Sequence, residues 1–282
     1  MVELRLQSIP LSGYLSPDAV VVCLSSLIKL KTFVLRFRST QSCPTNSIRH
    51  LSSLARVTLP SLTQFVFYGP NKYIENLVAQ VNISLLDHLE ITLFDELLFE
   101  TSQLNQFVGR TKKFKVPSRA LFEFDNYSDA ARFSLSEDPV HGPTLVFPIS
   151  CVDYLDFQLP FLFALSSLSS SPLRHSSLER LDILTRYSPL SVYDTDDTTW
   201  LELSHPFTAV KDLYLDNRSV LHFGPTLQEF TEERATYILP ALQRIFVQDY
   251  GRPENAKARG AIESFIAARR FYGRPVAVHN WE

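Results

Sequence analysis

Histidine and cysteine side chains are the first to examine for metal or nucleophilic chemistry in this 282-residue chain. The seven histidines lie at least 17 positions apart, so the sequence contains no His-Glu-x-x-His motif and no other close histidine pair typical of a zinc site. The cysteines, Cys23, Cys43 and Cys151, are too far apart for a Cys-x-x-Cys clip, and we expect buried thiols in a reducing compartment. The sequence therefore predicts no metal site and no cofactor.

Acidic and glycine-rich motifs give no catalytic signature either. The acidic cluster Asp194, Asp196 and Asp197 lacks the glycine and glutamate of a calcium-binding EF loop, since Thr199 and His205 hold those positions. The eight glycines lie at least nine positions apart, which excludes glycine-rich phosphate loops, the dinucleotide fingerprint and the nucleophile elbow. We therefore predict a protein that is not an enzyme, and an enzyme with an unrecognised site is the least favoured alternative.

Basic side chains gather at residues 110–119 and 252–274, and such clusters can bind nucleic acid. The whole chain, however, has 27 Lys and Arg against 30 Asp and Glu, whereas nucleic-acid-binding proteins usually carry a basic excess. On the expected last helix Ile262, Phe265 and Ile266 form an apolar face, which would leave the arginines largely on the solvent side. Nucleic-acid binding is therefore kept as the second hypothesis.

Targeting signals are not recognisable in the sequence. Glu3 and Arg5 interrupt the N-terminal stretch where a signal peptide would need an apolar run. The longest apolar stretch, residues 19–30, is too short to span a bilayer and is broken by serines and a lysine. We expect a protein of the cytoplasm, or of the nucleus, with no membrane association.

A repeated apolar pattern indicates which elements must position any functional side chain. The pattern apolar-x-x-apolar-x-apolar recurs in steps of 24–36 residues. Clear copies begin at Leu30, Leu62, Leu86, Leu178, Val210 and Leu242, and weaker copies begin at Met1, Thr111, Gly142 and Gly273. The last two apolar positions of a copy lie two residues apart and hence on one face of a short strand. Stretches between the copies have helical spacing, and Ser16 is expected to cap one such helix at Pro17.

One strand and one helix in each step of about 30 residues is typical of a leucine-rich-repeat solenoid. We predict an α/β fold of about ten irregular strand–helix units, with a parallel sheet on the concave side and helices on the convex side. The prediction is a single domain over residues 1–282, with an irregular insertion near residues 117–172. In this insertion, LFEF at Leu121–Phe124 and FSL at Phe133–Leu135 indicate extra strands of a hairpin.

The concave surface is the remaining candidate for a functional site. Residues that flank the second core position of each strand point away from the core. We predict partner contacts at Arg36, Tyr68, Glu90, Lys115, Asp182, Tyr214, Asp216 and Gln248, and the same rule places Phe246 and His279 on this surface. Tyrosine and arginine frequently anchor protein interfaces. The predicted function is therefore non-catalytic protein–protein recognition.

Several sequence segments resemble the carboxy-terminal repeat region of fungal F-box/leucine-rich-repeat proteins. These segments are YLSPDAVVVCLSSLIKLKTFVL (residues 14–35), LPSLTQFVFYG (59–69), HPFTAVKDLYL (205–215) and AIESFIAARRFYGRPVAVHNWE (261–282). The resemblance extends over nearly the whole chain and implies the substrate receptor of a ubiquitin ligase. In that family an F-box docks the Skp adaptor of a cullin-RING ligase, and the repeats recruit the protein to be ubiquitinated. No F-box is recognisable here, so a Skp-type adaptor is expected as a partner only if an F-box precedes this sequence.

Overall fold

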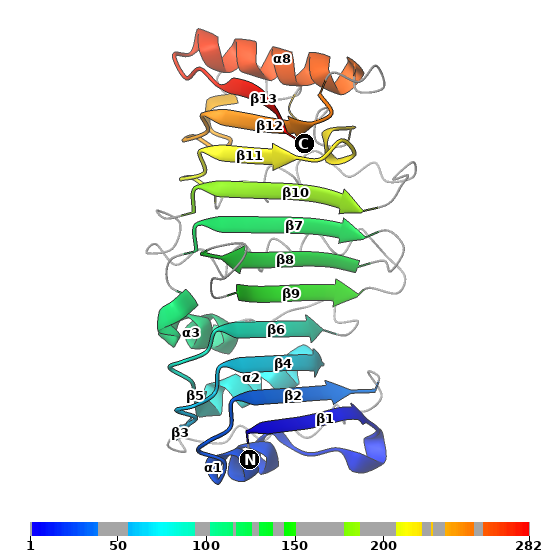
Figure 1. The fold of residues 1–282 in the computed structure, drawn as a ribbon, viewed down its shortest axis with the longest axis vertical. Coiled ribbons are helices and arrows are strands. Elements are labelled where there is room, and N and C mark those ends of the chain that lie inside the picture. The colour runs from blue at the N-terminus through cyan, green and yellow to red at the C-terminus, as the bar shows by residue number, and fades with distance from the viewer. Residues whose placement is uncertain are drawn as a thin grey trace. The chain divides into compact units, whose positions relative to one another are not determined.

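The computed structural model describes residues 2–38, 56–93, 102–114, 117–125, 130–137, 144–150, 178–186, 207–221, 227, 235–250 and 256–281. These residues have a mixed α/β architecture based on mostly parallel strands, which confirms the prediction of an α/β fold at this level (Figure 1). They divide into two compact units. Unit 1 consists of Met1–Lys115 and Ser136–Val152, and unit 2 consists of Val116–Leu135 and Asp153–Glu282. The single domain expected over residues 1–282 stays a prediction.

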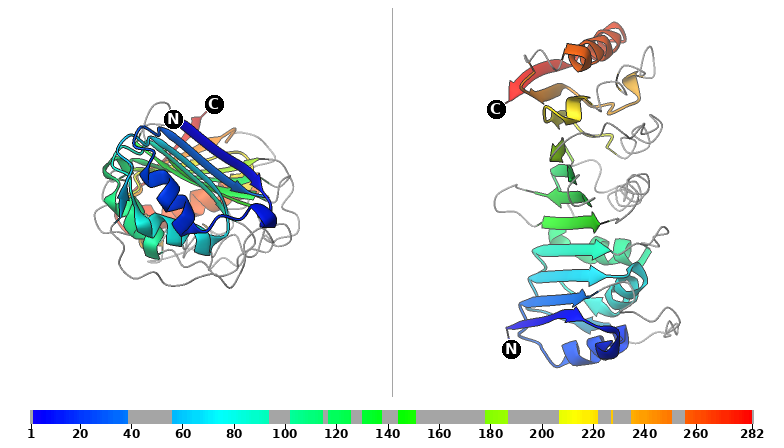
Figure 2. Two further views of the ribbon diagram at one scale, coloured as in Figure 1. Left: turned by 90° about the horizontal axis from the view of Figure 1, so that it is seen from below. Right: turned by 90° about the vertical axis from the view of Figure 1, so that its right-hand side faces the viewer.

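Unit 1 is built on strands in the order β1-β2-β4-β6-β9 (Figure 1). Their bounds are β1 (Glu3–Ile9), β2 (Thr32–Phe37), β4 (Gln64–Gly69), β6 (His88–Leu93) and β9 (Thr144–Ser150), and neighbours pair in parallel. A small parallel pair joins β3 (Val57–Thr58) and β5 (Val81–Asn82). The helices are α1 (Pro17–Ser25), α2 (Asn71–Gln80) and α3 (Ser102–Arg110), with 3-10 turns η1 (Leu11–Gly13) and η3 (Lys112–Phe114). Figure 2 shows α1, α2 and α3 on one face of these strands.

The predicted apolar pattern forms the core of unit 1. Phe33 on β2 lies opposite Leu4 on β1 and Phe65 on β4, and Phe65 lies opposite Leu89 on β6. The residues that begin these copies, Leu30, Leu62 and Leu86, are buried as well. Parallel neighbours in register bring equivalent positions to about 4.8 Å of each other. The rings of Phe33 and Phe65 therefore stack, with their centroids 5.3 Å apart.

Two side chains cap the helices of unit 1. The Ser16 hydroxyl accepts a hydrogen bond from the Ala19 N–H at 3.2 Å, which confirms the predicted cap of α1. The buried Glu75 carboxylate on α2 accepts hydrogen bonds from the N–H groups of Gln103 and Leu104, at 2.8 Å each. A carboxylate is favourable at this end of α3, where the first N–H groups have no partner inside the helix. Only the first of these caps has a local sequence signal.

Unit 2 is built on strands in the order β8-β7-β10-β11-β12-β13. Their bounds are β8 (Ala130–Ser136), β7 (Arg119–Asp125), β10 (Arg180–Arg186), β11 (Asp212–Leu215), β12 (Arg244–Gln248) and β13 (Ala277–Trp281). From β7 to β13 neighbours pair in parallel, whereas Figure 1 shows β8 running opposite to β7. The two strands expected in the insertion are therefore confirmed. Unit 2 also contains the long helix α8 (Ala256–Phe271).

Apolar residues in matching positions also form the core of unit 2. Leu181 on β10 lies opposite Leu213 on β11, Leu213 opposite Ile245 on β12, and Ile245 opposite Val278 on β13. Leu181, Leu213 and Ile245 are buried. These positions are 32 or 33 residues apart in the sequence, so the spacing of the apolar pattern sets the register of the parallel strands.

The prediction that a copy of the apolar pattern beginning at Thr111 forms a strand is wrong. Lys112–Phe114 form a 3-10 turn, and the next strand begins only at Arg119. The Thr111 N–H donates to the Phe107 carbonyl at 3.2 Å, and the Phe114 N–H donates to the Thr111 carbonyl, so helical hydrogen bonding continues beyond α3. Both Thr111 and Phe114 are buried. A spacing of three residues fits a helical turn as well as the entry to a strand, and the apolar pattern does not distinguish the two.

Arg269 is an exception to the expectation that the arginines of the last helix lie largely on its solvent side. Ile262 and Phe265 are buried as expected, but Arg269 is also buried, with 0% of its surface exposed. Its Nη1 donates to the carbonyls of Ala235 (3.0 Å) and Ile238 (2.9 Å), among others in residues 235–242. Burial, and next the charge of Arg274, lower the pKa of Arg269 to about 10, so the guanidinium is still charged at neutral pH. These carbonyls lie in turns, where they need donors from elsewhere.

The expectation of buried cysteines is wrong for Cys23, whose side chain is exposed. Cys23 follows the buried pair Val20 and Val21 on α1 and precedes buried Leu24, so it lies on the outer side of the helix. Cys43 and Cys151 lie outside the described residues.

Candidate functional site

The candidate site lies on the face of the unit 2 strands opposite α8, called here the distal face (Figure 2). Side chains alternate between the two faces of a strand, and the buried Leu181 and Ile183 of β10 point to the core. Arg180 and Asp182 therefore point to the distal face. By the same alternation Tyr214 on β11, Phe246 on β12 and His279 on β13 occupy one row beside Asp182.

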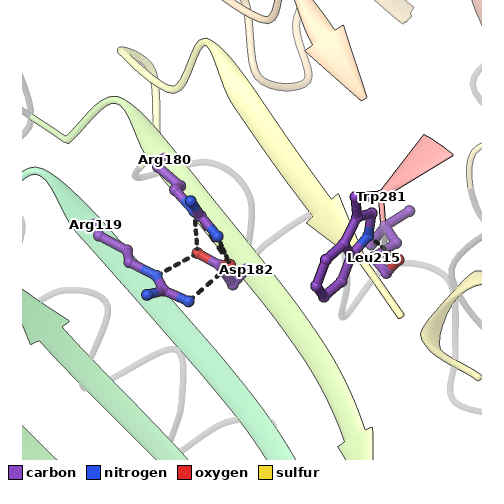
Figure 3. A network of polar contacts seen from close by, with 5 residues as sticks. All are labelled: Arg119, Arg180, Asp182, Leu215 and Trp281. Carbon is purple, nitrogen blue, oxygen red and sulfur yellow. Dashed lines mark hydrogen bonds and ion pairs between the residues drawn. The ribbon is translucent and has the colours of Figure 1, made fainter. Parts of the chain in front are cut away.

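A buried ion cluster lies at one end of this row (Figure 3). Arg119 on β7 donates to both carboxylate oxygens of Asp182, with Nε–Oδ2 2.7 Å and Nη2–Oδ1 2.9 Å. Arg180 donates to the same carboxylate, with Nη2–Oδ1 2.7 Å and Nε–Oδ2 2.9 Å. Asp182 is 1% exposed, so these two arginines take the place of water around its carboxylate. Burial lowers the pKa of Arg180, but the hydrogen bonds and charge of Asp182 outweigh burial and raise it above its ordinary value.

A second pair, nearer to solvent, follows on β11 and β12. Arg244 donates to both oxygens of Asp212, with Nε–Oδ1 2.6 Å and Nη2–Oδ2 2.7 Å. The Arg244 side chain is half exposed, and Asp212 is 17% exposed. Arg119, Arg180, Asp212 and Arg244 occupy equivalent positions of successive strands. A row of charged residues therefore runs beside the row that contains Tyr214, Phe246 and His279.

The aromatic row forms a continuous stack. The guanidinium of Arg180 lies 3.6 Å from the centroid of the Tyr214 ring. The rings of Tyr214 and Phe246 are 4.3 Å apart and nearly parallel, at 6°, and Phe246 stacks on His279 at 5.1 Å and 25°. We call Arg180, Tyr214, Phe246 and His279 the stacked column. It forms because the spacing of paired strands, about 4.8 Å, matches the distance between stacked rings.

Trp281 fixes the column from the side. Its ring contacts Tyr214 edge to face, with centroids 5.8 Å apart and an angle of 78°. Its Nε1 donates a hydrogen bond to the Leu215 carbonyl at 3.1 Å (Figure 3). A ring held by both contacts loses little further freedom when a partner binds, which favours affinity.

The stacking decides which parts of the rings are available to a ligand. Arg180 and Phe246 cover the two faces of Tyr214, and Tyr214 and His279 cover those of Phe246. These rings therefore present their edges to the distal face. His279, at the end of the column, is exposed.

The predicted contact residues of unit 2 have different environments. Tyr214 lies in the column, whereas Asp182 is held in the buried ion cluster. Asp216 accepts hydrogen bonds from the N–H groups of Thr185 (2.7 Å) and Ser219 (2.6 Å), so its carboxylate caps the turn that follows β11. Gln248 lies at the end of β12, opposite Trp281. Arg180 contacts two of the predicted residues, Asp182 and Tyr214.

The predicted contact residues of unit 1 lie on the face of its strands opposite α1, α2 and α3. Arg36 is exposed and lies opposite the half-buried Tyr68 on the next strand. Glu90 is half-buried, and its Oε2 lies 3.5 Å from the Nε2 of His88. Lys115 lies outside the described residues.

Sequence reasoning did not predict the role of five residues that organise the distal face of unit 2, although one of them, Arg119, belongs to the basic stretch 110–119. These are Arg119, Arg180, Asp212, Arg244 and Trp281. A signal for three of them exists, because Arg180, Asp212 and Arg244 succeed one another at intervals of 32 residues. The contact of Arg119 with Asp182 has no such signal, since it requires the order of β7 and β10 in the sheet.

Several basic side chains of the two predicted stretches form intramolecular contacts. Arg110 donates to the Val78 carbonyl at 3.2 Å, and burial, followed by the charge of Arg56, lowers its pKa. Lys113 pairs with Asp87. In the second stretch Arg274 donates to the Pro240 carbonyl at 2.8 Å, and residues 252–255 lie outside the described part of the chain.

Metal-binding groups and membrane-spanning helices are both absent from the described residues. Those residues contain no group of three or more His, Cys, Asp or Glu side chains placed to hold a metal ion. None of their helices combines the length and the apolar character needed to cross a membrane. The acidic cluster at Asp194, Asp196 and Asp197 lies outside the described residues.

Comparisons with known proteins give no relative. No protein-family model, curated protein or solved structure matches this chain significantly.

Proposed function

We propose that this chain is a non-catalytic protein-recognition domain that binds a partner through the faces of its strands opposite the helices. The observation that carries this proposal is the stacked column of Arg180, Tyr214, Phe246 and His279 on the distal face of unit 2. Tyrosine, tryptophan and arginine are the residue types most enriched at the energetic centres of protein interfaces. Here they are held by stacking before any partner arrives, which lowers the entropic cost of binding.

The geometry of the column favours a protein partner over a nucleic acid. Proteins that bind single strands stack the bases on the faces of aromatic rings. Both faces of Tyr214 and Phe246 are already covered. The nearby arginines are paired with Asp182 and Asp212, which reduces the positive charge available to phosphates. Ring edges and paired charges suit apolar and polar side chains of another protein better than they suit a base.

The fold proposed for this function is a leucine-rich-repeat-like solenoid. Its support is the register in unit 2, where paired positions of β10, β11, β12 and β13 recur every 32 or 33 residues. Following the resemblance to fungal F-box proteins, the partner would be a protein brought to a ubiquitin ligase. If an F-box precedes this sequence, a Skp-type adaptor would bind it, in the cytoplasm or nucleus.

Affinity capture with a matched pair of variants tests the recognition face. Tagged wild-type chain, Phe246→Ala and Phe271→Ala would be compared for captured proteins by mass spectrometry, after circular dichroism has shown that each is folded. Phe271 on α8 is 82% exposed, so its substitution removes an exposed phenyl group away from the column. We expect Phe246→Ala to lose partners that the wild type and Phe271→Ala retain.

Two results would contradict the proposal. One is the same set of captured proteins for all three chains. The other is salt-dependent binding of a single-stranded RNA oligonucleotide that Phe246→Ala weakens, which would assign the column to nucleic acid.

A further inference from the structure

Strand β13 is the last strand in the order of unit 2, and its core position is less covered than the equivalent positions before it. Ile245 and Leu213 are 0% exposed and Leu181 is 3% exposed, whereas Val278, in the same row, is only half-buried. Ala277 and His279 on this strand are exposed as well. The apolar row of the sheet therefore ends at a residue that still has apolar surface to bury.

The backbone of β13 also has groups directed away from β12. The Ala277 N–H donates to the Gln243 carbonyl at 2.9 Å, and Ala277 pairs with Arg244. In a parallel pair, alternate residues direct both their N–H and C=O groups to the same neighbour. Ala277, His279 and Trp281 therefore face β12, and the backbone groups of Val278 and Asn280 point to the outer edge. Such an edge is a template for another strand.

The stacked column reaches the same edge. Phe246 covers one face of the His279 ring, and His279 is exposed. A strand added at the usual spacing of about 4.8 Å would place one of its side chains against the other face of this imidazole. A planar group suits this position, because the preceding side chains of the row, Tyr214 and Phe246, are planar and stack on each other.

We propose that the outer edge of β13 accepts an extended segment of a partner protein as an additional β-strand. The segment carries an apolar side chain beside Val278 and an aromatic ring or guanidinium beside His279, continuing the rows that end there. This inference rests on the proposed recognition function and deepens it by naming how the partner binds. Main-chain hydrogen bonds supply affinity in such pairing, and the alternating side chains supply specificity.

A synthetic peptide with the sequence of residues 242–249, LQRIFVQD, is a suitable probe. It contains the apolar–aromatic–apolar alternation of β12, the strand that β13 already pairs with. Binding of the fluorescein-labelled peptide to the 282-residue chain would be measured by fluorescence anisotropy. A second peptide, LQRIAVQD, lacks only the ring and is expected to bind about three- to tenfold more weakly.

Val278→Pro removes the outward N–H of β13 without removing a hydrogen bond to β12, and proline is tolerated at such positions of edge strands. Val278→Ala is the matched control, since it shortens the side chain and keeps the N–H. We expect Val278→Pro to bind LQRIFVQD at least about tenfold more weakly than Val278→Ala. Circular dichroism of both variants would verify that the fold is retained.

Equal affinity of the two variants for the peptide would overturn the inference. So would self-association of the chain that Val278→Pro abolishes, without peptide binding, because the edge would then pair with a second copy. Capture of natural partners separates this inference from the proposed function. If Val278→Pro retains partners that Phe246→Ala loses, the recognition face stands and the edge-strand inference fails.

Discussion

The two units stack aromatic rings by the same register rule but on opposite faces of their strands. In unit 1, Phe33 stacks on Phe65 at the core side, where both rings are buried. In unit 2, Tyr214 stacks on Phe246 on the distal face, and the core positions hold aliphatic residues such as Leu213 and Ile245. Strand spacing produces a stack wherever aromatic residues repeat in register. The face on which they repeat decides whether the stack stabilises the fold or is available for binding.

The two units also differ in the side chains that pair across the strands on the face opposite the helices. On the distal face of unit 2, Asp182 and Asp212 each accept two hydrogen bonds from an arginine on a neighbouring strand. In unit 1 the corresponding face carries Val34 and Val66, which are buried and lie opposite each other. The pairs of aspartate and arginine across neighbouring strands therefore organise the distal face of unit 2.

The largest expected effect separates the two aromatic stacks. Phe65→Ala should lower the free energy of unfolding by about 3–5 kcal/mol, because it leaves a cavity in a buried core. Phe246→Ala, at a half-buried position, should lower it by only about 1–2 kcal/mol. Urea unfolding followed by circular dichroism measures both values. Equal losses would show that the distal stack is as structural as the core stack.

An intermediate effect is expected at the ion cluster. Asp182→Ala removes the shared partner of Arg119 and Arg180, and should cost about 3 kcal/mol of unfolding free energy, at the low end for a broken buried pair because both arginines reach solvent. Asp212→Ala is the matched control, since its partner Arg244 is half exposed, and should cost about 0.5–1 kcal/mol. The same denaturation measurement applies. A smaller loss for Asp182→Ala than for Asp212→Ala would contradict the assignment of Asp182 as a structural residue.

The smallest effect concerns the contact between Tyr214 and Phe246 itself. A double-mutant cycle with Tyr214→Ala, Phe246→Ala and the double variant should give a coupling energy of about 1 kcal/mol, as for other stacked rings. A coupling energy near zero in unfolding experiments would mean that the two rings do not support each other. The stack would then not hold the two rings in place before a partner binds.

Local signals in the sequence predict part of this structure well. Apolar spacing identifies the buried residues of β2, β4, β6, β10, β11 and β12, and the Ser16–Pro17 pair identifies the start of α1. The same kind of signal fails at Thr111 and Phe114, because a spacing of three residues also fits the 3-10 turn found there. It fails at Arg269 because amphipathic pattern assigns arginine to solvent, whereas the carbonyls of residues 235–242 provide acceptors inside the fold.

The sequence by itself determined which side chains of each strand point to the core and which share the opposite face, because this depends only on alternation along one strand. It also determined that equivalent positions recur about every 32 residues in unit 2. Only the tertiary structure decided that Arg180 covers Tyr214, that Arg119 and Arg180 share Asp182, and that β13 ends the row. Those contacts join residues of different strands, so they depend on strand order and register, which no single stretch of sequence specifies.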